Sequence, residues 1–410
     1  YSDRYFIIFN GEIYNYIEIK KTLIKNKYIF KTKSDTEVIL AAYDFWGNKC
    51  FNYFNGMWSL IIYDLKKNKF IACRDRYGVK PLYYRKLYNN YYFSSEVKQL
   101  LSLNENNKVN KQTLSRYLYS DLYSNGDQTF IKNIHQVKPG SYINFDAQNF
   151  KFKKLRWYRF KEKKLKNKDA NIEVRNILEE SVKLRLRSDV KIGISLSGGI
   201  DSSTIASIIA NIKKKSYKKI YTFSSRSKDE NDEYNYVKEF NKKYNFKNIP
   251  ITLRFNNFKT DFIKIVKQHD QPISNLSIFS EWEVFKKLKS KKIKVNIDGH
   301  GADEQLCGYE NFLSLYILEC IKKFELKLIY EFFSELFFSN IKNRFLFITK
   351  IFFNLLPQKI INFLKDLNKQ KIKKNWINLK SEKIKKEKFH KNLVLNQNFL
   401  QFFFHKLTKA

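Results

Sequence analysis

The sequence predicts an α+β domain followed by an α/β domain, whose doubly wound parallel sheet leads into a helical C-terminal part. Three observations support this prediction. Residues 1–150 mix short strand patterns with helical ones, residues from about 171 alternate strands with helices, and the pattern beyond Gly308 is helical. We therefore expect domains at 1–150 and 171–410, joined by a lysine-rich exposed linker at 151–170.

Strands of the first domain are indicated by runs that are rich in aromatic and β-branched residues. A helix is expected over 35–46, because Asp35-Thr36-Glu37 is a typical helix start and Gly47 a typical stop. Strands that meet in hairpins, with helices on their faces, predict a layered α+β domain. The predicted strands are residues 4–9, 58–63, 70–73 and 91–94.

The second domain shows a regular alternation of buried strands and helices, which is typical of a doubly wound parallel sheet. Helices are expected over 202–212 and 233–244, each after a strand, with further helices before the last strand. The predicted strands are residues 190–196, 220–224, 249–253 and 293–297.

Composition excludes some classes of function. With 43% hydrophobic and 29% charged residues, the chain is typical of a globular protein. Its net charge of +38 would ordinarily suggest nucleic acid or a membrane surface. The lysines are scattered, however, and Lys, Asn, Ile, Tyr and Phe are abundant together, which indicates compositional drift; we expect no specific nucleic-acid partner. No segment approaches the ~20 apolar residues of a membrane span. The four cysteines lack metal-ligand spacing and predict a reduced, cytoplasmic protein.

The sharpest motif lies where the first strand of the second domain enters its helix. Its glycines let the backbone approach a ligand closely, its serines offer hydroxyl groups, and the helix N-terminus favours an anion. Asp201 beside such an anion indicates a shared metal ion, expected to be Mg²⁺. A serine-capped glycine turn is the plain alternative, and a Walker loop is excluded because no Gly-Lys-Ser/Thr follows. The string reads Ser197-Gly198-Gly199-Ile200-Asp201-Ser202-Ser203.

A second string, residues 298–309, follows the last strand and begins Asp298-Gly299-His300. Loops at the carboxyl ends of the strands of an open α/β sheet converge on the ligand. We therefore expect Asp303 to bind the same cation as Asp201.

A third motif, Asn10-Gly11-Glu12-Ile13-Tyr14-Asn15, is expected directly after the first strand, with Asp35 downstream. On its own it is better explained by a hairpin turn. Releasing the amide nitrogen of glutamine needs a nucleophile, an oxyanion hole and a group that binds the α-ammonium. Asn10 and the Gly11 N–H suit the oxyanion hole, and Glu12 and Asp35 suit the ammonium group.

The strings together resemble those of asparagine synthetases. Residues 197–203 resemble the pyrophosphate-binding loop of ATP pyrophosphatases (the PP-loop family). Residues 298–309 resemble the string that asparagine synthetases, within that family, carry after the fourth strand. The first domain resembles a class II glutamine amidotransferase domain, with the layered sheets of an N-terminal-nucleophile hydrolase. The resemblance to the glutamine amidotransferase domain is carried by the strings 9–16, 35–43, 54–64, 74–84 and 93–101.

The resemblance implies that glutamine, aspartate and ATP give asparagine, glutamate, AMP and pyrophosphate through an acyl-adenylate. It assigns Leu196 and Ser225 to the adenosine, and Asp298 and Gly299 to ATP or the adenylate. The cofactors are then ATP and Mg²⁺, the partners are small molecules, and a homodimer is left open. The implied ATP-binding residues are Leu196, Ser197, Gly198, Gly199, Asp201, Ser202, Ser203, Ser225, Asp298 and Gly299.

The family's nucleophile is an N-terminal cysteine, and its adenylation uses a lysine beyond the helical region. Neither is matched in this sequence, so we expect a fragment that lacks both ends of the enzyme. Cys50 and Cys73 lie in core-like runs and are expected to be packing residues.

Three alternatives stay open. His300 stands where many asparagine synthetases carry an acidic residue, and Ser225 where they carry an aliphatic one, so the acceptor could be another carboxylate such as a sugar acid. A tRNA-modifying PP-loop enzyme would suit the charge but not the glutamine motif. A binding protein without activity would not need Asp201 and Asp303.

Overall fold

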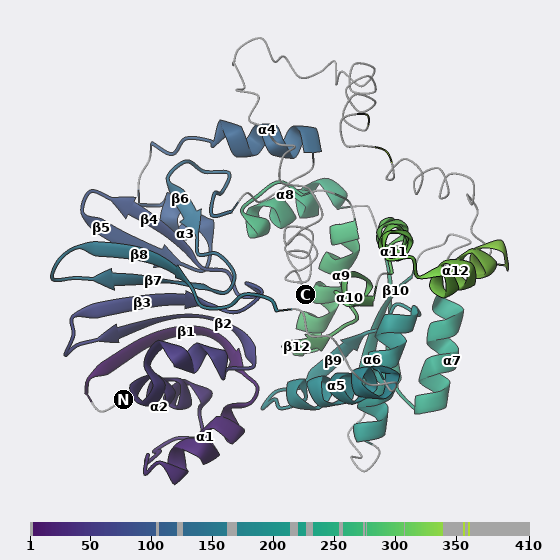
Figure 1. The fold of residues 1–410 in the computed structure, drawn as a ribbon, viewed down its shortest axis with the longest axis horizontal. Coiled ribbons are helices and arrows are strands. Elements are labelled where there is room, and N and C mark those ends of the chain that lie inside the picture. Colours follow the sequence, from purple (N-terminus) through teal and green to yellow (C-terminus); the bar gives the residue numbers. More distant parts are fainter. Residues whose placement is uncertain are drawn as a thin grey trace. The chain divides into compact units, whose positions relative to one another are not determined.

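The computed structural model describes residues 3–103, 106–120, 126–161, 170–213, 220–226, 233–253, 257–273, 275, 277–306, 308–338, 356 and 360. The chain divides into two compact units, of which the first is Tyr1–Gly299 and the second begins at His300. Figure 1 shows the elements of both.

Antiparallel strands form two sheets in the first 160 residues. One sheet has the strand order β1-β2-β3-β7-β8, and the other has the order β5-β4-β6. The strands of the first sheet are β1 (Tyr5–Ile13), β2 (Gly56–Asp64), β3 (Lys69–Arg74), β7 (Ser141–Asp146) and β8 (Lys151–Arg156). Those of the second are β4 (Tyr83–Leu87), β5 (Asn90–Ser94) and β6 (Ile134–Gln136).

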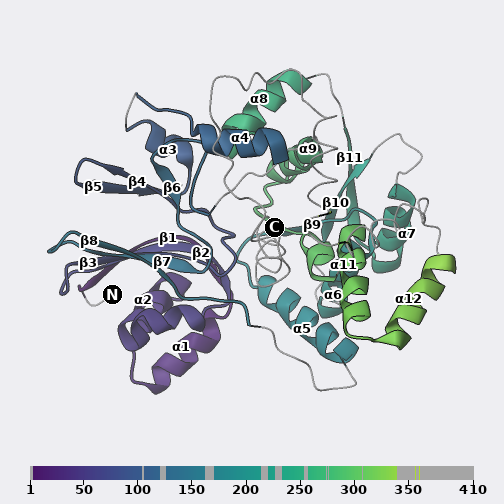
Figure 2. The ribbon, with the colours of Figure 1, turned by 45° about the horizontal axis from the view of Figure 1, so that its top comes forward.

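The two sheets pack face to face, with helices on their outer faces. Leu23 and Ile39 of α1 (Tyr16–Lys25) and α2 (Asp35–Trp46) join Trp58 of β2 in one core, to which the 3₁₀ helix η1 (Gly47–Asn52) contributes. Tyr84 and Ile143 belong to the core between the sheets. On the other side α3 (Val97–Leu101) packs against β6, and α4 (Lys111–Ser120) follows. The predicted layered α+β arrangement is therefore confirmed (Figure 2).

The strands expected at 58–63, 70–73 and 91–94 and the helix at 35–46 are confirmed. The expected end of the first strand is wrong, because β1 continues to Ile13 and includes the Asn10-Gly11-Glu12 motif. The motif pairs with β2, with Gly11 opposite Trp58. A glycine is needed there because a Cβ would lie 2.2 Å from the Met57 carbonyl oxygen, so it signals close strand contact and not a turn.

The span expected as a linker, 151–170, begins with β8, which pairs with β7. The sheet therefore extends past the predicted boundary at 150. Because β8 is an edge strand with mostly exposed side chains, its lysines face water and its composition is that of a linker. Residues 162–169 lie outside the described part of the chain.

The strands after residue 190 form a parallel sheet with the order β11-β10-β9-β12, which confirms the predicted parallel sheet. Each face of this sheet has its own hydrophobic core. On one face three helices contribute Val182, Ala206 and Val237, which pack with Ile194. On the other face Leu288 packs with Phe223. The strands are β9 (Ile192–Ser195), β10 (Tyr221–Arg226), β11 (Lys247–Thr252) and β12 (Val295–Ile297). The helices are α5 (Ala170–Arg185), α6 (Ile200–Ile212), α7 (Tyr234–Tyr244), α8 (Phe258–His269) and α9 (Ser277–Ser290).

The second unit is helical as far as it is described, with α10 (Ala302–Leu306), α11 (Glu310–Lys322) and α12 (Leu326–Phe338). The helical prediction beyond Gly308 is thus confirmed to Phe338, and the rest of it lies outside the described residues apart from Leu356 and Ile360. Among the described residues, the helices are too short or too polar to span a bilayer.

Candidate functional site

Two carboxylates expected in the glutamine site lie close together. Asp35 is the first residue of α2, whose preceding residue Ser34 caps the helix by accepting a hydrogen bond from the Thr36 N–H. The Asp35 carboxylate accepts a hydrogen bond from the backbone N–H of Ile13 (3.0 Å). Burial raises the pKa of Glu12, the negative charge of Asp35 raises it further, and Lys80 opposes both. Two adjacent carboxylates are suited to bind a substrate ammonium group.

The Asn10 side chain is oriented by Ser95, which lies in the string 93–101 but was not among the predicted site residues. Its amide Nδ2 donates a hydrogen bond to Oγ of Ser95, which directly follows β5 (3.1 Å). Asn10 itself is exposed at the edge strand β1, so its amide is accessible to a ligand. The sequence carried no signal for the pairing of Asn10 with Ser95, because 85 residues separate them.

The string 74–84 builds a rigid loop beside the same site. Asp75 is buried, and its carboxylate accepts hydrogen bonds from backbone N–H groups before and after it. The guanidinium of Arg74 donates to the carbonyls of Gly78 (2.7 Å) and Lys80 (2.7 Å). This loop fixes the position of Lys80, which acts electrostatically on Glu12. The donors to Asp75 are the N–H groups of Trp58, Tyr77, Val79 and Lys80.

Cys50 and Cys73 are both fully buried. Burial raises the pKa of each thiol well above its ordinary value. Because the thiolate is the nucleophilic form, two buried neutral thiols do not fit the role of nucleophile. Their environment supports the expectation that they are packing residues.

The predicted anion loop connects β9 to α6. Gly199 is the N-cap residue of α6, and its N–H donates to the Ser197 Oγ (3.2 Å). The hydroxyls of Ser197 and Ser202 lie 3.0 Å apart, which closes the loop. Gly198 has a φ of 100°, and a Cβ there would lie 2.8 Å from the Glu233 carbonyl oxygen. The loop is therefore held in one conformation that presents the first turn of α6.

The loop after β12 meets the same helix end. A Cβ on Gly299 would lie 2.8 Å from the Ser202 nitrogen and 3.0 Å from the Asp201 Cβ, so these backbones are in contact. Asp298 lies beside Asn296, whose Nδ2 donates to the Ser195 Oγ on β9 (2.9 Å). The two loops are therefore in contact at Gly299, and their convergence on a ligand stays a prediction.

The two residues assigned to adenosine binding differ in solvent exposure. Leu196 is buried in the core, and its N–H donates to the Phe223 carbonyl on β10 (2.9 Å). Its side chain therefore packs inside the domain. Ser225 is exposed near the carboxyl end of β10, one strand away from the anion loop.

Asp303 belongs to the second unit, in the first turn of α10. Its carboxylate lies against Gly308, where a Cβ would be 2.0 Å from Oδ1, and its carbonyl accepts the Gly308 N–H (2.9 Å). Among the described residues, no group of three or more His, Cys, Asp or Glu side chains could hold a metal ion. Mg²⁺ is commonly held by one or two carboxylates together with substrate phosphates, so carboxylates beside an anion loop fit it. The pairing of Asp201 with Asp303 stays a prediction.

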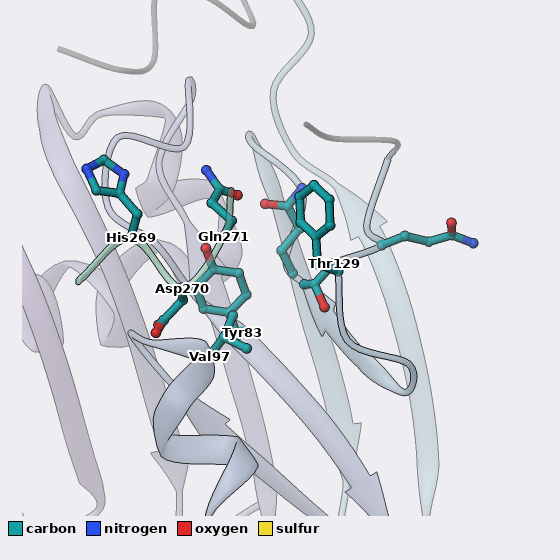
Figure 3. A pocket seen from close by; sticks show the side chains of 9 residues that line it. Tyr83, Val97, Thr129, His269, Asp270 and Gln271 are labelled. Carbon is teal, nitrogen blue, oxygen red and sulfur yellow. The ribbon is translucent and has the colours of Figure 1, made fainter. Parts of the chain in front are cut away.

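A small cavity of about 40 Å³ is lined in part by Tyr83 of the string 74–84 and by Val97 of the string 93–101. Figure 3 shows Tyr83, Val97, Thr129, Asp270 and Gln271 among the side chains that line it. The predicted site residues do not line it.

Comparison with known proteins gives two matches to family models. The glutamine amidotransferase domain matches residues 1–158, and asparagine synthase matches residues 173–380. A Methanocaldococcus jannaschii protein, provisionally named asparagine synthetase (glutamine-hydrolysing) 2, is 33% identical over 77% of this chain and 61% of its own. The asparagine synthetase (glutamine-hydrolysing) 1 of Bacillus subtilis is 33% identical over 75% of this chain and 48% of its own.

The chain thus spans about half to three fifths of the length of these curated relatives. A solved glutamine phosphoribosylpyrophosphate amidotransferase of B. subtilis is similar over 60% of each chain, at 12% identity and a TM-score of 0.28, which is too distant to support any conclusion. The asparagine synthase match covers just over half of the chain, directly after the glutamine amidotransferase match. The chain therefore belongs to the asparagine synthase family.

Proposed function

We propose that the protein makes an amide from glutamine nitrogen at the expense of ATP, converting aspartate to asparagine through an acyl-adenylate. The products are asparagine, glutamate, AMP and pyrophosphate. The proposal is supported chiefly by the contact of Gly299 with Asp201 and Ser202, which joins the second string to the anion loop. The two domains expected at 1–150 and 171–410, the first extended by β8 to Arg156, divide the work between glutamine hydrolysis and ATP chemistry.

In the glutamine half, Glu12 and Asp35 bind the substrate α-ammonium group as carboxylates. The Asn10 side-chain amide and the Gly11 N–H stabilise the oxyanion that forms when a nucleophile attacks the side-chain amide of the substrate glutamine. The hydrogen bond from Asn10 to Ser95 supports this role, because a donor that is already oriented costs little reorganisation in the transition state.

In the ATP half, the residue 197–203 loop and the N-terminus of α6 bind the pyrophosphate that leaves. Backbone N–H groups and the helix dipole stabilise its negative charge. The Leu196 backbone and the Ser225 hydroxyl contact the adenosine, and Asp298 and Gly299 adjoin the α-phosphate or the adenylate. Asp201 and, by prediction, Asp303 would hold Mg²⁺, which would neutralise further negative charge on the phosphates.

A second candidate is the same reaction with another carboxylic acid as the acceptor. His300 favours it, because it replaces the acidic residue that many asparagine synthetases carry at this position. Acceptor identity is therefore tested separately from the ATP chemistry.

The test uses the full-length protein with glutamine, Mg²⁺ and ATP labelled on the α-phosphate. We expect labelled AMP that depends on the acceptor, together with asparagine when the acceptor is aspartate. AMP formation with a different acid, and not with aspartate, would support the second candidate. Release of ADP and orthophosphate with every acceptor would exclude the proposed chemistry.

A further inference from the structure

A short segment that runs from the last residue of α5 toward β9 contacts the neighbourhood of the glutamine motif from the other domain of the first unit. It comprises residues 185–189, whose sequence is Arg185-Leu186-Arg187-Ser188-Asp189. It contacts Tyr14, which belongs to the Asn10–Asn15 motif and directly follows β1, and Glu18 in the first turn of α1.

Arg187 makes the most specific of these contacts. One terminal nitrogen of its guanidinium donates to the Tyr14 carbonyl (2.9 Å) and to Oε2 of Glu18 (2.7 Å), and the other donates to Oε1 of Glu18 (2.6 Å). The guanidinium lowers the pKa of Glu18, and the carboxylate raises that of Arg187. A planar fork that bonds both oxygens of a carboxylate fixes geometry as well as charge. Arg187 therefore ties the strand end to the first turn of α1.

The flanking residues reinforce this contact. The Arg185 guanidinium lies over the ring of buried Tyr14, 5.0 Å from its centroid. The Tyr14 N–H donates to the Asn55 carbonyl (2.8 Å), so the ring and both backbone groups of this residue have defined neighbours. Asp189 acts electrostatically on Glu12, the carboxylate proposed to bind the ammonium group of glutamine.

The same segment leads directly into the anion loop. After Asp189 the chain enters β9, which is bonded to β10 on one side and to β12 on the other. β9 ends at Ser195, and the anion loop begins at Ser197. From Arg187 to Ser197 the chain spans at most about 35 Å. One strand held on both sides is a stiff connection between the two proposed sites.

We propose that Arg187 is a positioning residue that couples the occupancy of the residue 197–203 loop by ATP to the affinity of the glutamine site. The proposal deepens the proposed function and rests on it. Thermodynamic linkage requires the effect to be reciprocal, so glutamine must change the affinity for ATP by the same factor. Couplings between sites are typically about 5- to 150-fold.

The test measures glutamine and ATP binding by calorimetry on the full-length protein, each with and without the other ligand. In the wild type we expect each ligand to tighten the other by the same factor. Arg187→Ala should reduce this factor to about one and raise the KM for glutamine, while ammonia-dependent amide formation keeps its rate. Arg187→Lys should restore only part of the coupling, because an ammonium cannot bond the carboxylate as a fork.

A matched control is Arg175→Ala, which removes an exposed ion pair with Glu179 on α5 (2.9 Å). It should leave the coupling unchanged. Glu18→Gln keeps the side-chain shape and should lower the coupling if Arg187→Ala does not fold. Equal coupling in the wild type and in both Arg187→Ala and Glu18→Gln, or no effect of ATP on glutamine affinity in the wild type, would overturn the proposal. ADP release would contradict the proposed function alone, since the binding assay does not depend on which bond of ATP is cleaved.

Discussion

At the scale of single residues, Gly11 shows how the glutamine motif depends on backbone geometry. Its φ is 154°, and a Cβ would lie 2.2 Å from one backbone atom of Met57 and 2.6 Å from another of Trp58. These neighbours belong to β2 and cannot rotate away as the end of a side chain can. The residue is therefore restricted to glycine by both conformation and space.

Gly11→Ala is expected to destabilise the protein by about 2 kcal/mol or more, because strain of about 1–3 kcal/mol adds to a clash with backbone. Chemical denaturation monitored by circular dichroism measures the loss. Gly47→Ala is the matched control, since Gly47 also has a positive φ (56°) but has no neighbouring atom within 4 Å of a Cβ. It should cost about 1–3 kcal/mol, because only its backbone conformation (φ 56°, ψ −142°) is strained and no clash adds to it. A smaller loss for Gly11→Ala than for Gly47→Ala would contradict this account.

The sequence predicted some residue contacts and could not predict others. The proximity of Glu12 and Asp35 followed from the chemistry of an ammonium site, and electrostatics link the two. The contact of Asn10 with Ser95 and the bonds of buried Asp75 were missed, because they join residues far apart in the sequence or serve only the backbone of a loop. Composition and spacing report local structure, whereas these contacts arise from tertiary packing.

At the scale of helices and strands, local signals decided which predictions were accurate. The start and end of α2 were predicted correctly, because a cap and a glycine stop are both encoded within a few residues. The strand β8 was missed, since an edge strand exposes most of its side chains and has the composition of a linker. The end of β1 was also missed, because Asn-Gly is the usual signal for a hairpin turn.

Ser34→Ala tests how far the cap of α2 supports the site. Loss of the hydrogen bond from the Thr36 N–H should destabilise the protein by about 1 kcal/mol. The first turn carries Asp35, so its fraying should also raise the KM for glutamine. Ser334→Ala, within α12, is the control, since its hydroxyl only donates to the Glu331 carbonyl of the same helix. An unchanged KM in Ser34→Ala would show that Asp35 is held by Ile13 alone.

At the scale of the whole molecule, the net charge of +38 is the property that most directly favours nucleic acid over small molecules as the substrate. If the lysines are compositional, nucleic acid should bind weakly and without preference for sequence or structure. Its affinity should fall steeply as salt rises from about 50 to about 200 mM, because such binding depends on counterion release. Filter binding measures the affinity for one tRNA and for DNA of the same length at both salt concentrations. A tight complex with the tRNA that survives the higher salt would favour the tRNA-modifying alternative.

The two half-reactions of the proposed function should be separable by single substitutions in the full-length protein. Asp201 lies in the first turn of α6 beside Gly299, and Asp35 lies beside Glu12 on a different domain. Asp201→Asn should lower AMP formation by at least about 100-fold, since a metal-bound carboxylate contributes several kcal/mol, and it should leave glutamine hydrolysis intact. Asp303→Asn should behave in the same way.

Asp35→Asn should have the opposite effect. Loss of a charge-assisted hydrogen bond to the substrate ammonium costs about 1.5–3 kcal/mol, which raises the KM for glutamine about 10- to 150-fold. The remaining amide oxygen can still accept the Ile13 N–H, so the strand end keeps its partner. Ammonia as the nitrogen donor should then restore full amide formation in Asp35→Asn but not in Asp201→Asn. Comparable losses of both half-reactions in both variants would show that these carboxylates stabilise the fold and do not bind separate substrates.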